Sequence, residues 1–403
     1  MLADALLLQL GYNATLVALG AAALGVAAGA TGTFLFLRKR ALVSDAVSHA
    51  TLPGLALAFL IMVALGGDGR MLAGLLLGSA ASALAGLVCV SYLTRHTRLS
   101  EDAAIGAVLS VFFGFGIVLL TVIQTLQSGR QAGLESFLLG STAGMLLSDA
   151  LLIAGGGIAV LLAVTALRRP MLMVAFDPGY AEVQGVNVPR IDLAIMALVM
   201  AVTVVGLKIV GLILIVALLI IPPVAARFWS DRAERVVLIA GLFGGLAGYL
   251  GAAISAVAPD LPTGPIIVLI AFGLFLVSIL FTPGRGVLAG LYRYRRFQRE
   301  VHLRQGLMAL AHGQPVYEGL TRRLLRRADF QRADGVTTAE GRAAASAALR
   351  DEARWQALRA SDRLAELAVR DDGLTRIDEV LTPDQVAELD RRRAGPREVP
   401  DGL

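Results

Sequence analysis

Nine apolar runs, separated by short polar segments rich in arginine, fill the chain between residues 14 and 283. Each run has about 17 to 25 residues, the length that an α-helix needs to cross the hydrocarbon core of a bilayer. Hydrophobic residues make up 56% of the 403 residues, more than a soluble domain of ordinary composition contains. We therefore expect an all-α polytopic membrane protein with about nine transmembrane helices. The predicted spans are 14–37, 41–65, 71–94, 102–126, 148–167, 191–207, 209–226, 236–257 and 264–283.

Basic residues between the runs predict the orientation, because cytoplasmic loops carry an excess of Lys and Arg. Placing the cluster of Arg38, Lys39 and Arg40 inside puts the N-terminus outside and the arginine-rich C-terminus in the cytoplasm. We expect a multi-pass protein of the cell's plasma membrane. Three basic residues then fall outside, namely Arg70, Arg130 and Lys208.

The long run from Ile191 to Val224 leaves the helix count open. It is interrupted by Gly206, Lys208 and Gly211, so it predicts either two short helices or a re-entrant pair.

An acid and an imidazole lie four residues apart at the start of the second apolar run. Asp45 and His49 therefore share one face of the predicted helix, with Ser48 beside them. Pro53 lacks an N–H and so frees the backbone carbonyl of His49. Two interpretations remain open from spacing alone: a polar path for a cation, or a packed helix start in which the acid caps and the imidazole bonds a neighbouring carbonyl.

The sequence does not favour an enzyme. A phosphate-binding loop needs a lysine followed by Ser or Thr, whereas Lys39 is followed by Arg and Lys208 by Ile. The single cysteine, Cys89, excludes a disulfide framework within the chain, and none of the four histidines lies in a catalytic motif.

The chain contains six motifs in the following order: VSDAVSHATLPG, RLSEDAAIGAVLSVFFGFGIVL, LESFLLGS, FDPGYAEVQGV, VGLILIVALLIIPPVAA and PDLPTGPIIVLIAFGLF. This order is typical of the permease subunits of zinc, manganese and iron(II) ABC importers, which the chain resembles from about Leu16 to Thr282. The resemblance implies a second permease, either an identical copy or a paralogue, a separate cytoplasmic ATPase, and an extracytoplasmic protein that delivers the metal. It also implies that Asp177, Pro178, Ala181 and Gly185 belong to the segment that rests on the ATPase.

With this resemblance, the cation path becomes the favoured interpretation, with Asp45, His49 and Ser48 as metal ligands. Carboxylate and imidazole suit Mn(II), Fe(II) and Zn(II), and the sequence does not decide among the three. We expect a divalent metal as the transported substrate and no permanently bound cofactor. Few ligands per subunit make a weak site, as passage of the ion requires.

The composition changes after the last run, which predicts a transmembrane domain over 1–284 and a small cytoplasmic domain over 285–403. The first part of the second domain, RYRRFQRE, is suited to contact anionic membrane lipid. The remainder resembles, in degenerate form, the winged-helix and dimerisation regions of diphtheria-toxin-repressor-type regulators. Asp378 and Glu379 stand where that pattern has glutamate and histidine, so metal sensing is not favoured, and the ten-residue spacing of His302 and His312 fits no tight chelate. Nucleic-acid binding is not favoured because the domain is tethered to a membrane.

Two alternatives come from other classes of protein. A secondary cation transporter would also carry an intramembrane acid, but it should show inverted repeats, which the sequence lacks. A membrane-anchored metal-responsive regulator would make the C-terminal domain the functional part, but it would not need nine spans.

Overall fold

The structure is a computed structural model that describes residues 12–67, 69, 71–125, 147–207, 209–257, 261–360, 365–369 and 371–393. The LESFLLGS motif, Arg70, Arg130, Lys208 and Asp260 lie outside these residues. The chain divides into two compact units, 1–287 and 288–403. Apart from one isolated β-bridge, the regular structure of the described residues is helical.

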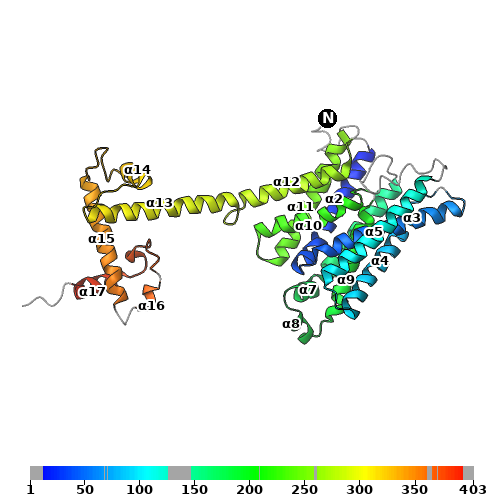
Figure 1. Cartoon of the computed structure of the whole chain (residues 1–403), viewed down its shortest axis with the longest axis horizontal. Helices are drawn as coiled ribbons and strands as arrows, with labels where there is room; N and C mark the ends of the chain where they lie inside the picture. The colour runs from blue at the N-terminus through cyan, green and yellow to red at the C-terminus, as the bar shows by residue number, and fades with distance from the viewer. Residues whose placement is uncertain are drawn as a thin grey trace, which may run out of the picture. The chain divides into compact units, whose positions relative to one another are not determined.

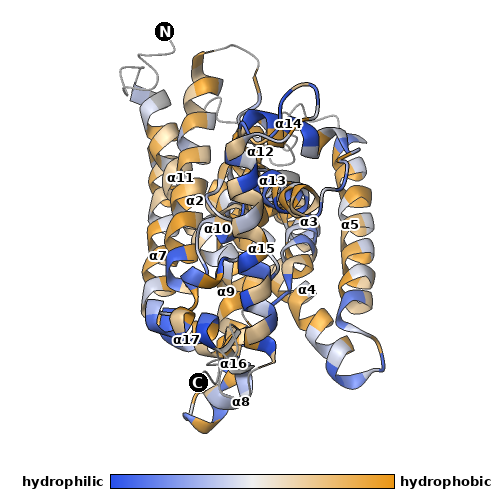
Figure 2. Cartoon of the chain, turned by 90° about the vertical axis from the view of Figure 1, so that its left-hand side faces the viewer, coloured by the Kyte–Doolittle hydropathy of each residue, from blue (hydrophilic) through white to orange (hydrophobic). Residues whose placement is uncertain are grey.

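The first unit is a helical bundle (Figure 1). Eight of its described helices are long and apolar enough to cross a membrane. Figure 2 shows predominantly hydrophobic residues along two of them, α5 (Glu101–Thr125) and α11 (Ala233–Val257). These eight are α2 (Tyr12–Leu37), α3 (Ala41–Ala64), α4 (Leu72–His96), α5 (Glu101–Thr125), α7 (Leu147–Phe176), α9 (Val188–Gly206), α11 (Ala233–Val257) and α12 (Thr263–Phe281). The bundle is completed by α10 (Leu212–Trp229) and the six-residue α8 (Pro178–Val183).

The expected nine spans therefore correspond to eight long helices and α10, whose described apolar stretch, Ile215–Trp229, is shorter. The ambiguous run forms two helices, α9 and α10, which are separated at Gly211. Gly211 has φ +87°, a left-handed conformation that glycine adopts without a steric penalty. The fifth span was predicted too short, because α7 continues beyond 167 through Arg168, Arg169 and Pro170.

Helices α2 and α11 approach so closely that their backbones touch. A Cβ on Gly25 would lie 2.1 Å from the carbonyl oxygen of Gly244, and one on Gly248 would lie 2.2 Å from that of Ala21. Small residues at helix interfaces allow this approach in membrane proteins. Helix α2 also packs against α7, α9 and α10. It is therefore the central helix of the unit.

On the other side of the bundle, α3 lies against both α4 and α5 (Figure 1). Gly54 of α3 and Gly78 of α4 permit a second close contact, since a Cβ on Gly54 would lie 2.0 Å from the carbonyl oxygen of Gly78. Helix α5 begins where expected, because the Oγ of Ser100 accepts a hydrogen bond from the N–H of Ala103.

The second unit has its own hydrophobic core, formed around the fully buried Trp355. The bridge between Gln331 and Thr337 closes a turn between α14 and α15. Because Thr337 takes part in that bridge, the cap of α15 is Thr338, whose side chain accepts from the N–H of Gly341. The resemblance of this unit to a winged-helix regulator remains a prediction. Its helices are α13 (Val287–Ala311), α14 (Gly319–Arg327), α15 (Ala339–Arg359), α16 (Ala365–Ala368), the 3₁₀ turn η1 (Ile377–Glu379) and α17 (Pro383–Arg393).

Candidate functional site

Asp45 and His49 lie side by side in the first turns of α3. The Oδ1 of Asp45 is 3.4 Å from the Nε2 of His49, as the four-residue spacing predicts. The side chains are 39% and 18% exposed, respectively, while most neighbouring residues of α3 are buried. The pair is therefore the polar, accessible part of the helix start.

The imidazole of His49 has unused bonding capacity. Its Nδ1 is buried and has no hydrogen-bond partner among the described residues. The ring of Phe113, on α5, packs against it edge to face, with 4.9 Å between the ring centroids. The Nε2 of the imidazole faces Asp45, while its Nδ1 is buried and unpaired among the described residues.

Ser48 does not join this pair. Consecutive residues of an α-helix differ by about 100° in direction, so Ser48 and His49 face different sides. Ser48 is fully buried, and its hydroxyl donates to the carbonyl of Ser44 at 2.8 Å. Of the three predicted ligands, the structure brings together Asp45 and His49 only.

A groove of about 580 Å³ follows the face of α3 beyond His49. Pro53, Leu57 and Ile61 continue the four-residue spacing of the pair and line this groove, together with Phe112 and Phe115 of α5. Among the described residues, no group of three or more His, Cys, Asp and Glu side chains is placed to hold a metal ion. The pair therefore offers two ligands in an otherwise apolar setting.

The predicted ATPase-contact segment forms the short helix α8 and the turns on either side of it. Asp177 caps α8 by accepting from the N–H of Tyr180 at 2.9 Å, and Pro178 occupies its first turn. Ala181 is fully buried. Gly185 adopts φ +80° just after the helix. All four predicted residues thus shape the segment.

Two large hydrophobic side chains of α8 are exposed, those of Tyr180 and Val183. Of the four predicted residues only Ala181 is buried, so Asp177, Pro178 and Gly185 are exposed beside them. The FDPGYAEVQGV motif contains Tyr180 and Val183, but an apolar residue in a sequence does not by itself indicate that its side chain is exposed.

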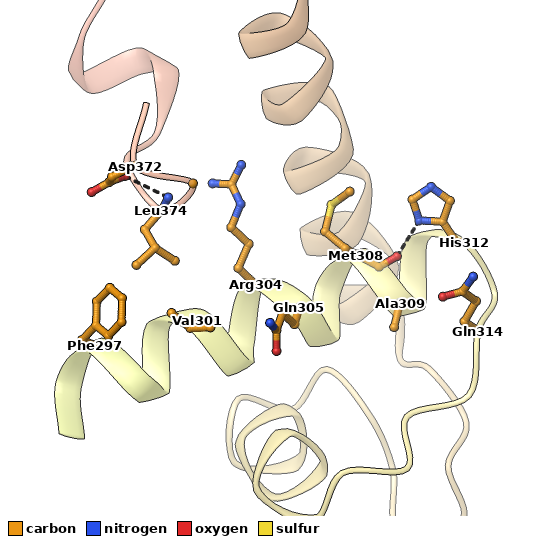
Figure 3. Close-up of a pocket in the computed structure, with 11 residues that line it drawn as sticks. Phe297, Val301, Arg304, Gln305, Met308, Ala309, His312, Gln314, Asp372 and Leu374 are labelled. Atoms are coloured by element: carbon orange, nitrogen blue, oxygen red, sulfur yellow. Dashed lines mark hydrogen bonds between the residues drawn. The ribbon is translucent and has the colours of Figure 1, made fainter. Parts of the chain in front are cut away.

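The two histidines of the second unit are engaged locally. His302 lies 3.0 Å from the carboxylate of Glu318, and its Nδ1 is also within 3.2 Å of the Thr321 hydroxyl. His312 bonds the carbonyl of Met308 at the edge of a pocket of about 450 Å³ that also contains Asp372 (Figure 3). Neither histidine belongs to a metal-binding group among the described residues.

Comparison with known proteins assigns the first unit. The model of the ABC 3 transport family matches residues 12–282, which is more than half of the chain. The chain belongs to the ABC 3 transport family. It is a multi-pass permease of the ABC transporter type, a transport subunit and not a catalytic one. The family match includes Asp45, His49 and α8, and it ends before the second unit.

Metal transport proteins of two bacteria match the chain over 285 residues or more. The chain is 39% identical to the manganese transport system membrane protein MntC of Bacillus subtilis over 308 residues, 76% of this chain and 70% of the relative. It is 41% identical to the zinc transport system membrane protein TroC of Treponema pallidum over 285 residues, 71% of this chain and 94% of the relative. The solved structure of PsaBC from Streptococcus pneumoniae in complex with Fab matches with a TM-score of 0.61 and 30% identity. That match covers 71% of this chain and 98% of the other.

Proposed function

We propose that this permease imports a divalent transition metal across the plasma membrane, with the N-terminus outside and the C-terminus in the cytoplasm. Relatives named for manganese and for zinc transport support this proposal. Asp45 and His49 supply a carboxylate and an imidazole, ligands that suit Mn(II), Zn(II) and Fe(II) alike. The observation that carries the proposal is the accessible Asp45–His49 pair on α3, inside the region that matches the family.

The two-ligand site is suited to passage of the ion and not to storage. A closed shell of four protein ligands would hold a metal such as zinc tightly, whereas two ligands leave positions for water and for exchange. A second permease, identical or paralogous, completes the path. The apolar groove beyond His49 carries no further charge to retain the ion.

The driving force comes from a separate ATPase that rests on α8. Its exposed Tyr180 and Val183 provide the contact surface, and the capped helix holds them in place. An extracytoplasmic binding protein delivers the metal on the opposite side. Selectivity among metals resides mainly in that protein, because the Asp45–His49 pair accepts all three ions.

Metal uptake by the complete transporter tests this proposal. Asp45→Asn and His49→Ala should each reduce uptake at least about tenfold, since each removes one of the two ligands, while the complex with ATPase still assembles. Ser48→Ala is the matched control and should retain uptake, because Ser48 faces the interior. Wild-type uptake by both the Asp45 and His49 variants would refute the metal path.

Two further arms separate the alternatives. Inactivation of the ATPase should abolish uptake, whereas continued uptake would indicate a secondary transporter. Competition among Mn(II), Zn(II) and Fe(II), with the cognate binding protein supplied, should identify the preferred ion.

A further inference from the structure

Four charged side chains form an ion cluster where five helices meet. Arg38, at the end of α2, donates to the carboxylate of Asp192 at 2.8 Å, and Arg40 binds the same Asp192 oxygen at 3.2 Å. Arg40 also lies 3.1 Å from the carboxylate of Glu101, the first residue of α5. The second terminal nitrogen of the Arg38 guanidinium, Nη1, donates to the carbonyl of Val174 in α7 at 2.9 Å. We name these charged residues, Arg38, Arg40, Glu101 and Asp192, the inner-end cluster.

The inner-end cluster joins the metal pair to the segment that carries α8. Val174 and Asp192 flank α8 on its two sides, in α7 and α9. Arg40 immediately precedes α3, and Asp45 follows in the first turns of that helix. Arg38, Arg40 and the carboxylate of Asp192 thus connect the helices on either side of α8 directly to the start of α3, the helix that carries the metal ligands.

The cluster is formed at a desolvation cost. The side chains of Arg38 and Asp192 are only 14% and 19% exposed. Burying charges costs free energy that a single contact recovers only in part, so such pairs are weak evidence for stability alone. A cluster of this kind is better explained as a specific connection between the elements that it joins.

The cluster also has the capacity to change its pairing. The Nε of Arg38 and the Oδ1 of Asp192 are buried and have no hydrogen-bond partner among the described residues. Arginine and carboxylate can bind through two parallel hydrogen bonds, and here one of the two is unused. A pocket of about 520 Å³ borders Arg40, Glu101 and Asp192 and gives them room to move. A small shift of α9 relative to α2 would therefore exchange the single hydrogen bond between Arg38 and Asp192 for two parallel ones.

We propose that the inner-end cluster transmits movement of α8 to the start of α3, and so links ATP hydrolysis to release of the metal from Asp45 and His49. Asp192, Arg38 and Arg40 act as positioning residues in this role. The inference rests on the proposed function, because it requires an ATPase docked at α8 and a metal at the Asp45–His49 pair.

The test measures metal transported per ATP hydrolysed by the full chain, reconstituted with its ATPase and binding protein. Asp192→Asn should leave assembly and basal hydrolysis near wild type and lower that ratio at least fivefold. Asp192→Glu, which keeps the charge, should restore most of the ratio. Asp231→Asn is the matched control, because Asp231 pairs with Arg227 and Arg285 and its side chain is 60% exposed. It should leave the ratio unchanged.

A second pair of variants covers the case in which Asp192→Asn does not assemble. Arg40→Glu should lower the ratio, and the combination with Glu101→Arg should restore it by re-forming the ion pair with exchanged charges. A normal ratio in Asp192→Asn, or equal loss in Arg40→Glu with and without Glu101→Arg, would overturn the inference. If wild type transports metal and Asp45→Asn does not, the proposed function stands even where this inference fails.

Discussion

At the scale of single residues, the direction of a side chain decides its role more than its chemistry does. Asp45 and Ser48 are both polar and lie three residues apart, yet Asp45 is accessible and Ser48 is fully buried. Spacing placed both on nearly the same face. The hydroxyl of Ser48 instead bonds the preceding turn, which is a common arrangement for serine within a helix. The sequence therefore identifies the candidate ligands but not their accessibility.

Asp372 shows how one carboxylate organises a turn in the second unit. Its Oδ1 accepts from the N–H groups of Thr375 and Leu374, at 2.7 and 2.9 Å (Figure 3 draws the bond to Leu374). These bonds favour the charged form and hold the pKa of Asp372 below its ordinary value. The carbonyl of Thr375 in turn accepts from the indole N–H of Trp355 at 3.0 Å, so the turn supports the core.

We predict a pH-dependent effect of Asp372→Ala on this turn. Because the folded pKa is lowered, the stabilisation is fully present above the ordinary pKa of an aspartate and is lost as the pH falls through the folded value. At pH 7 the amides of Leu374 and Thr375 should therefore exchange several-fold faster in the variant. The difference should shrink as the pH falls below the ordinary pKa of an aspartate and through the lowered folded value. Hydrogen exchange of the full chain measures this, with Asp384→Ala as control; equal exchange at pH 7 would contradict it.

At the scale of elements, the α2–α11 contact depends on the absence of side chains. Gly25→Ala would place a Cβ 2.1 Å from the backbone carbonyl of Gly244, which cannot rotate away. Overpacking of this kind costs about 1–3 kcal/mol, so we expect a lower midpoint of thermal unfolding and less monodisperse protein in detergent. Gly114→Ala, on α5, has no atom within 4 Å of the new Cβ and should be neutral. Equal stability of the two variants would refute the contact.

Element boundaries were predictable where charge and hydropathy change together. Helices α2, α3 and α4 end or begin close to the expected residues because arginines or glycines interrupt the apolar runs. The length of α7 was underestimated, because the predicted span ends at 167 and the helix at Phe176. Arg168 and Arg169 resemble the end of a span, whereas a helix can continue beyond the membrane boundary. The cap of α15 is Thr338 and not the adjacent Thr337, which takes part in the bridge with Gln331.

The family resemblance implied the segment that forms α8, but not the exposure of Tyr180 and Val183 on it. The residues that the family resemblance supplied, such as Asp177 and Gly185, shape the helix and its turns. The inner-end cluster was also missed, because its members are up to 154 residues apart and no local pattern connects Arg38 with Asp192. Long-range pairing of this kind becomes visible only in the folded chain.

At the scale of the whole molecule, each unit has its own hydrophobic core. The clusters of the first unit include residues of α2 to α12, and the cluster around Trp355 contains residues of the second unit only. The family match covers the first unit and stops at residue 282. The first unit therefore has a core that does not depend on residues of the second.

We predict that a chain ending at residue 287 still folds. Its thermal midpoint should lie within about 4 °C of the full chain, the shift that ~1 kcal/mol produces in a domain of this size. Size-exclusion chromatography and thermal unfolding in the same detergent measure this. Aggregation of the shortened chain would show instead that the second unit is required for folding.

The caps of α8 have a consequence for assembly. Asp177 at the start and Gly185 just beyond the end satisfy the termini of a helix that is otherwise too short to persist. The docking element that we propose is consequently preorganised, and little conformational entropy should be lost when a partner binds it. Association should then proceed as the meeting of two rigid surfaces, at a rate set by diffusion and orientation and with no refolding step.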